Sequence, residues 1–70
     1  MDVARIFGSN LKRCRHEKGL SQERLAELSG LHRTYISDIE GFRRNVSLRT
    51  VQRIADALEV EPYTLLREDP

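Results

Sequence analysis

The side chains best suited to chemistry in this 70-residue chain are the polar residues from His32 to Asp38. If this segment is a helix, its outer side carries an imidazole, a guanidinium, two hydroxyls and a carboxylate. Arginine can donate two hydrogen bonds to guanine, a threonine methyl can pack on thymine, and a carboxylate can accept from cytosine. These groups therefore favour contact with the base edges and phosphates of duplex DNA. The residues of this outer side are His32, Arg33, Thr34, Ser37 and Asp38.

Catalysis and metal binding are not indicated by the other reactive side chains. No Ser, Cys or Lys lies in a plausible triad, no glycine-rich phosphate loop is present, and so small a domain has little room for a desolvated pocket. A metal site would need Cys14, His16 and His32, but Cys14 and His16 are two residues apart and point in different directions on a helix. We therefore expect no enzymatic activity, metal, cofactor or small-molecule ligand, and we expect Cys14 to be a small buried hydrophobic residue.

A helix-turn-helix over residues 22–41 would present the polar side to a partner. Ala26 is small where the second helix must cross closely over the first. Gly30 lies where the chain must reverse, and glycine enters the left-handed region at little cost. Leu25, Ile36 and Ile39 fall on the inner side of the two helices and are expected to be buried.

Five helices and no strands account for the apolar pattern, which predicts an all-α fold with one domain over residues 1–70. The first helix is expected over about residues 3–18, the second from the N-cap Ser21 to residue 29, and the third over about residues 33–40. The fourth begins at Ser47, and a short fifth helix begins at Pro62. His32 is a poor cap for the third helix. The buried stripe predicted for the fourth helix consists of Leu48, Val51, Ile54, Ala55 and Leu58.

The charges are distributed unevenly although the net charge is only +1. Residues 1–53 hold eleven of the twelve Lys and Arg residues and six acidic residues, whereas residues 54–70 have a net charge of −4. A basic body with an acidic end suits a protein that meets phosphates on one side, and a mixed solvated surface is the alternative. The N-terminal segment has neither a membrane-spanning apolar run nor the order of a signal peptide, so we expect a cytoplasmic protein without membrane contact.

Two segments, LKRCRHEKGLSQERLAELSG and LHRTYISDIE, resemble the Cro/cI-type helix-turn-helix family of prokaryotic and phage regulators. The resemblance covers nearly the whole chain and implies a lambda-repressor-like domain of five helices that binds duplex DNA. Within the family, HRTYISDIE followed by RRNVSL is most similar to the controller proteins of restriction-modification systems. A DNA-binding antitoxin with the same fold is the alternative. A neighbouring restriction or methylase gene would favour the controller, and a toxin gene would favour the antitoxin.

The resemblance implies roles for individual residues. Arg15 and Glu40 match a pair that forms a buried salt bridge in phage repressors. His32 stands where controller proteins usually have an acidic residue, so the operator sequence cannot be inherited from a relative. Arg43 is expected to contact phosphate because it lies in the loop after the recognition helix. Residues that match DNA-contacting positions of the family are Gln22, Arg33, Thr34, Tyr35, Arg44 and Asn45.

Two protein partners are also expected. One recognition helix reads only a few base pairs, so we expect a homodimer, joined through apolar residues near the chain end: Val60, Tyr63 and Leu66. Val60 could instead belong to the core.

Glu23 and Glu27 are four residues apart and share a helix face. They match acidic positions through which the phage lambda repressor contacts RNA polymerase, and the alternative is a solubilising acidic pair.

Overall fold

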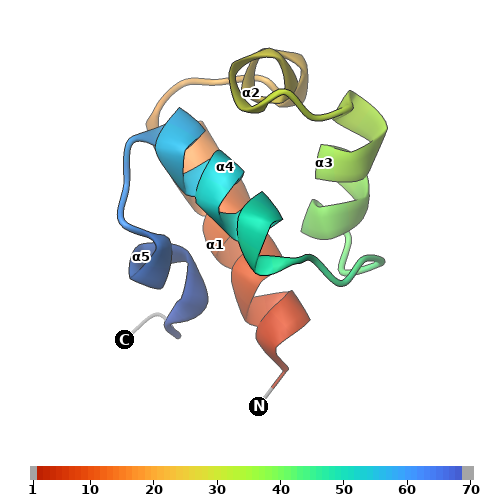
Figure 1. Ribbon diagram of the computed structural model, residues 1–70, viewed down its shortest axis with the longest axis vertical. Coiled ribbons are helices and arrows are strands. Elements are labelled where there is room, and N and C mark those ends of the chain that lie inside the picture. The colour runs from red at the N-terminus through yellow and green to blue at the C-terminus, as the bar shows by residue number, and fades with distance from the viewer. Residues whose placement is uncertain (1, 69–70) are drawn as a thin grey trace.

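Helices α1 (Val3–Glu17), α2 (Gln22–Ser29), α3 (Arg33–Glu40), α4 (Leu48–Leu58) and α5 (Pro62–Leu66) make up the computed structural model, which describes residues 2–68 (Figure 1). Residues 2–68 contain no β-strand, so the predicted all-α fold is confirmed. The helix boundaries also agree with the prediction to within a residue. No helix in this range is both long and apolar enough to cross a membrane.

Side-chain caps fix where three of the helices begin. The carboxylate of Asp2 accepts a hydrogen bond from the backbone N–H of Arg5, which begins α1. The hydroxyls of Ser21 and Ser47 accept from backbone N–H groups three residues later, at 3.0 and 3.1 Å, and begin α2 and α4. His32 makes no side-chain capping bond at the start of α3, so its imidazole is not used in that way.

The core lies where α1 and α4 run through the middle of the molecule, with α2 across the top, α3 on the right and α5 at the lower left of the view (Figure 1). α1 packs on α3, α4 and α5, while α2 packs on α3 and α4. Cys14 is buried in this core, as expected. The largest fully buried side chains come from all five helices: Phe7, Leu11, Leu25, Ile36, Ile39, Ile54, Leu58 and Leu65.

A buried ion pair joins α1 to α3. The Arg15 Nε donates to Glu40 Oε2 at 2.7 Å and Arg15 Nη2 donates to Glu40 Oε1 at 2.9 Å, so the pair is bidentate. Arg15 Nη1 also donates to the carbonyl of Leu20 at 2.8 Å. The hydrogen bond to Glu40 raises the pKa of Arg15, although burial works against it. The contact expected from the family resemblance is therefore present and fixes the recognition helix to α1.

A second buried polar residue, Asn10, joins α1 to the end of α5. Its side-chain amide donates to the carbonyls of Leu65 and Arg67, at 2.9 and 2.7 Å. The role of Asn10 was not predicted from the sequence. Its spacing from Phe7, Leu11 and Cys14 places it on the apolar face of α1, and that position was the available signal.

Leu48 is the one member of the predicted α4 stripe that is not buried. Its side chain is 82% exposed, whereas Val51, Ile54, Ala55 and Leu58 are buried. The prediction was wrong because Leu48 is the first residue of α4, where the helix passes the edge of the core and its side chain lines an open apolar groove. The buried residue of this first turn is Thr50.

Candidate nucleic-acid interface

The turn between α2 and α3 has the geometry of a helix-turn-helix. Gly30 ends α2 with φ +73°, in the left-handed region that glycine enters at little cost. The backbone N–H groups of Gly30 and Leu31 both donate to the carbonyl of Ala26, which closes the helix end. Ala26 is buried between the helices, and Leu25, Ile36 and Ile39 are buried beneath them, as predicted.

The first turn is the most accessible part of α3. His32, Arg33 and Thr34 are exposed, whereas Tyr35, Ser37 and Asp38 are half-buried. The structure thus gathers the predicted residues of the outer side along one face of α3, and the accessible groups are concentrated at its N-terminal end. That end is the part of a recognition helix that reaches base edges.

An ion pair across the motif connects two residues for which the sequence suggested separate roles. Arg33 Nε lies 3.2 Å from Glu23 Oε2, so the first turn of α3 is tied to the first turn of α2. Both side chains are more than half exposed. The charge of Arg33, the predicted base reader, is therefore partly neutralised by Glu23, which also orients its side chain.

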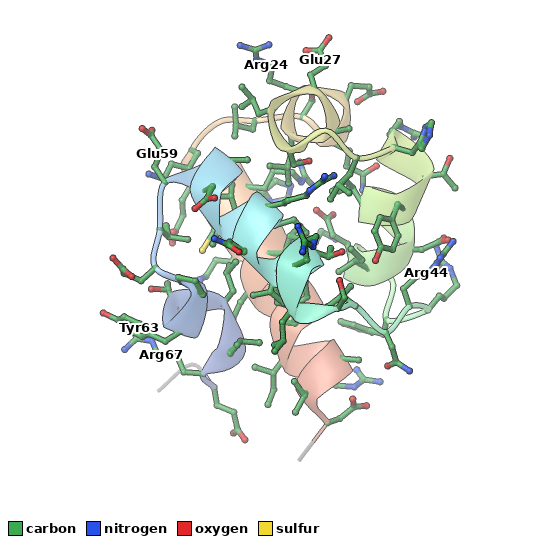
Figure 2. The ribbon with its side chains drawn as sticks, in the orientation of Figure 1. Arg24, Glu27, Arg44, Glu59, Tyr63 and Arg67 are labelled. Carbon is green, nitrogen blue, oxygen red and sulfur yellow. The ribbon has the colours of Figure 1, made fainter. Side chains whose placement is uncertain are left out.

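The loop after α3, residues 41–47, is attached to the face of α3 by its arginines. The guanidinium of Arg44 lies over the ring of Tyr35, 4.9 Å from the ring centroid. The Tyr35 hydroxyl lies 3.5 Å from Thr50 Oγ1, near the start of α4. Asp38 forms ion pairs with both Arg43 and Arg44, at 3.3 and 3.7 Å. Figure 2 shows Arg44 at the outer edge of the molecule beside α3.

The other side of this loop rests on α1. Phe42 has φ +63°, unusual for a bulky residue, and the guanidinium of Arg5 lies 4.5 Å from its ring centroid. A Cβ atom on Gly8 would overlap the carbonyl oxygen of Ile39 and lie 3.0 Å from the Phe42 ring. Gly8 therefore permits the close approach of α1 to the end of α3. A glycine inside a helical pattern was the available signal for this contact.

Gln22 makes a different contact from the one that the resemblance implies. Its side-chain amide donates to Glu40 Oε1 at 3.1 Å, and the residue is half-buried. A carboxamide has a second N–H and an oxygen, so this bond leaves it the capacity to bind another group. Contact between Gln22 and phosphate stays a prediction.

The residues predicted for protein partners lie on α2 and between positions 60 and 66, and Leu66 lines one apolar groove together with Asn45 and Val46 of the loop 41–47. Tyr63 is 64% exposed on α5 and Leu66 is 37% exposed, while Val60 is half-buried and packs on the core. In Figure 2, Tyr63 lies on the opposite side of the view from Arg44.

The acidic residues predicted to contact RNA polymerase lie on α2. In Figure 2, Glu27 projects outward from α2 beside Arg24. The carboxylate of Glu27 pairs with Arg24 at 3.1 Å. Both predicted acidic residues of α2 are thus engaged with arginines in the isolated chain.

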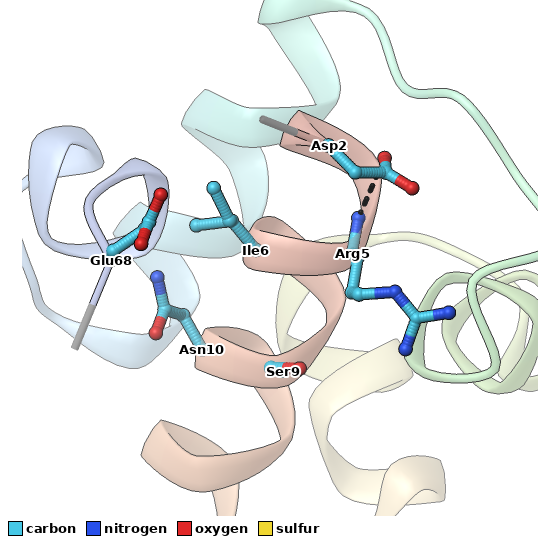
Figure 3. Close-up of a pocket in the computed structure, with 6 residues that line it drawn as sticks. All are labelled: Asp2, Arg5, Ile6, Ser9, Asn10 and Glu68. Carbon is cyan, nitrogen blue, oxygen red and sulfur yellow. Dashed lines mark hydrogen bonds between the residues drawn. The ribbon is translucent and has the colours of Figure 1, made fainter.

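A polar pocket of about 350 Å³ lies between the start of α1 and the end of the described chain, as Figure 3 shows. It is lined by Asp2, Arg5, Ile6, Ser9, Asn10 and Glu68. Asp2 caps α1, and Asn10 is bonded to α5, so these polar groups have structural roles. Within residues 2–68, no three His, Cys, Asp or Glu side chains are grouped so that they could hold a metal ion.

Comparison with known proteins matches residues 11–65 to the family described as Helix-turn-helix, of the Cro/cI type. The protein belongs to this family. Members of this Cro/cI-type family are DNA-binding transcriptional regulators rather than enzymes, so the α2–α3 unit is a DNA-binding element.

Several relatives in the Cro/cI-type family are control proteins. The chain is 47% identical over 66 residues to Control protein C.SmaI of Serratia marcescens, covering 94% of this chain and 79% of the relative. It is also 47% identical over 66 residues to Control protein C.BamHI of Bacillus amyloliquefaciens, covering 93% and 82%. Its structure is similar to that of the restriction-modification controller protein C.AhdI from Aeromonas hydrophila, with a TM-score of 0.86, 48% identity, and coverage of 89% of this chain and 94% of the other.

Proposed function

We propose that this regulator is a restriction-modification controller protein that binds a roughly palindromic operator as a homodimer. The observation that carries the proposal is the cationic surface formed by the first turn of α3 and the loop 41–47, in a chain almost half identical to two control proteins over nearly its full length. Guanidinium groups placed at both ends of a recognition helix can donate to base edges and to the flanking phosphates. The relatives favour this function over that of an antitoxin.

The proposed contacts divide between the helix and its surroundings. Arg33 and Thr34 extend from the exposed first turn of α3 and would reach base edges, with His32 beside them and Ser37 one turn further. The carboxylate of Asp38 pairs with the arginines of the loop, and its contact with cytosine stays a prediction. The residues that would contact the DNA backbone are Gln22, Tyr35, Arg43, Arg44 and Asn45.

The proposed dimer uses apolar surface at the end of the molecule where α1 and α4 begin. Leu66 and Tyr63 remain in the interface, and the exposed Leu48 joins them because it lines the same groove as Leu66 and Val3. An exposed leucine in an apolar groove favours burial against another surface. Val60 contributes mainly to the core of its own subunit. Two copies related by a two-fold axis would present two α3 helices to successive turns of the major groove, about 34 Å apart.

Selection of bound sites from a pool of random duplex DNA tests the operator proposal. We expect enrichment of two inverted half-sites whose centres lie about 10 base pairs, or a multiple of that, apart. Arg33→Ala should lose preference at particular base positions while Arg24→Ala, which changes an exposed arginine of α2 outside the proposed surface, should retain the wild-type profile. Enrichment of a single asymmetric site, or of no site, would contradict the proposal.

A further inference from the structure

One carboxylate on the recognition helix holds both arginines of the following loop. Asp38 Oδ1 accepts from Arg43 Nε and Nη2 at 3.4 and 3.3 Å, and Asp38 Oδ2 lies 3.7 Å from Arg44 Nε. The Arg43 backbone N–H also donates to the Asp38 carbonyl at 2.8 Å. Gly41 leaves room for this arrangement, because a Cβ atom there would overlap the Arg43 guanidinium.

We propose that Asp38 is a specificity-determining residue that acts through Arg43 and Arg44 by restraining both guanidinium groups when the protein meets DNA of arbitrary sequence. The inference rests on the proposed function, because it takes Arg43 and Arg44 as phosphate contacts. Asp38 itself is a positioning residue in this scheme. Its side chain is only 27% exposed, and both of its oxygens face arginines rather than a groove.

The restraint acts because a carboxylate and a phosphate compete for the same guanidinium donors. Non-specific binding to DNA comes almost wholly from phosphate contacts, whose positions vary from one encounter to the next. An arginine that reaches for a phosphate away from its restrained position must leave Asp38, and the lost ion pair offsets part of the free energy gained from the phosphate contact. The repulsion between Asp38 and the phosphates adds to this cost.

The operator complex avoids most of that cost because of the way Arg44 is held. Arg44 lies over the Tyr35 ring, and its Nε is 3.7 Å from Asp38 Oδ2. A guanidinium has five N–H donors, so Arg44 can donate to a phosphate from its terminal nitrogens without leaving Asp38. Once base contacts fix α3 in the groove, Arg44 can donate to an operator phosphate from its restrained position. Asp38 thus weakens the phosphate contacts that the arginines make on DNA of arbitrary sequence more than those that they make on the operator.

The test compares Asp38→Asn with Asp56→Asn, which removes the same charge from an exposed position on α4. Affinity is measured for the selected operator and for a random duplex of equal length over a range of salt concentrations. At about 0.15 M salt, Asp38→Asn should bind the random duplex about fivefold more tightly, the effect of one additional phosphate contact, and its salt dependence should steepen by about 0.9. Operator affinity should change less than about twofold, so the ratio of operator affinity to random-duplex affinity should fall.

A second pair of variants shows whether the effect passes through the arginines. In a protein that already carries Arg43→Gln and Arg44→Gln, Asp38→Asn should no longer change the affinity ratio. Thermal melts of all variants establish that they fold. Equal changes on both DNAs, or the same changes with Asp56→Asn, would overturn the proposal, because they would reflect net charge alone.

An altered preference at one base pair with unchanged binding to the random duplex would also overturn it, since Asp38 would then be a base reader. These failures leave the proposed function standing, because the wild-type protein would still bind its operator. Failure of the wild-type protein to enrich any site would instead contradict the proposed function. The proposed role of Asp38 depends on that function and would then be wrong as well.

Discussion

The guanidinium of Arg33 lies 3.2 Å from the carboxylate of Glu23, so the first turn of the recognition helix is tied to the first turn of α2. Exposed pairs of this kind contribute little to stability, because water screens both charges. The contact matters instead for binding, since the hydrogen-bond acceptors of a guanine must compete with Glu23 for the same donors. Arg33 therefore approaches DNA in an orientation that the protein sets in advance.

Arg33→Ala should weaken operator binding by roughly 1–3 kcal/mol and relax the preference at particular base positions. Arg43→Ala should instead weaken binding to the operator and to its base-substituted variants alike and reduce the salt dependence of operator binding by about one phosphate, because Arg43 lies in the loop behind the helix. Site selection and salt titration with both variants separate the two effects. A selection profile that Arg33→Ala leaves unchanged would show that Arg33 does not read bases.

Arg15→Ala should destabilise the fold by about 3–5 kcal/mol, because it leaves the buried carboxylate of Glu40 without its bidentate partner. The raised pKa of Arg15 means that its charge stabilises the folded state fully below the ordinary pKa of arginine. This stabilisation is lost only as the pH rises through the higher folded-state value, so the loss caused by Arg15→Ala should be present throughout the neutral range.

Arg13→Ala is the control for this measurement, since Arg13 is half-buried and pairs with the exposed Glu17 on the same helix at 3.9 Å. Helix pairs at this spacing contribute only about 0.3–0.5 kcal/mol. Thermal melts of the two variants should therefore differ widely. Coincident melting temperatures would mean that the buried pair does not stabilise the fold.

Gly8→Ala should also destabilise the protein, although alanine in place of glycine inside a helix usually stabilises it by up to about 1 kcal/mol. The added methyl would overlap the carbonyl oxygen of Ile39, and backbone atoms cannot move aside as a flexible side chain does. Overpacking of this kind costs about 1–3 kcal/mol. Denaturant unfolding should give Gly8→Ala a lower free energy of unfolding than the wild-type protein. Ser9→Ala changes the next position, which is exposed, and should have a free energy of unfolding close to that of the wild-type protein. A stabilised Gly8→Ala variant would contradict the close approach of α1 and α3.

The residues that were predicted well are those whose signal is local. Ser21 and Ser47 cap helices through bonds to residues three positions later, and Gly30 adopts the left-handed turn for which its residue type is suited. Repeating apolar positions likewise predicted the burial of Ile36 and Ile54. Such features depend on neighbours along the chain, and a sequence displays them directly.

The features that were missed depend on how the helices are placed in space. Leu48 has the right spacing for the buried face of α4, but nothing local shows that the core stops short of this first residue of the helix. The pair between Arg33 and Glu23 depends on the crossing of two helices. The carboxylate of Asp38 meets its arginines because the loop folds back on α3, and no helical spacing predicts that contact.

Leu48→Glu should shift the protein from dimer to monomer, because a buried carboxylate without a partner is unfavourable at an apolar interface. Sedimentation without DNA measures the shift directly. Leu28→Glu is the matched control, since Leu28 is 46% exposed on α2 and lies outside the apolar groove that contains Leu48. A wild-type protein that is monomeric at micromolar concentrations, or a Leu48→Glu variant that remains dimeric, would rule out this interface.

Contact with RNA polymerase through α2 predicts that charge reversal at Glu27 abolishes activation of a promoter with an upstream operator. Glu27 is the informative position because it projects outward and pairs with its neighbour Arg24, whereas Glu23 orients Arg33. Glu27→Lys should therefore leave operator affinity undiminished, since removing negative charge near DNA cannot weaken the electrostatic attraction. Glu59→Lys makes the same charge change at an exposed position beyond α4 and should retain activation. Transcription assays at saturating operator occupancy compare the variants, and adding Glu23→Lys then shows what the pair contributes together. Full stimulation by Glu27→Lys with DNA binding intact would mean that the acidic residues of α2 serve only as a solubilising pair.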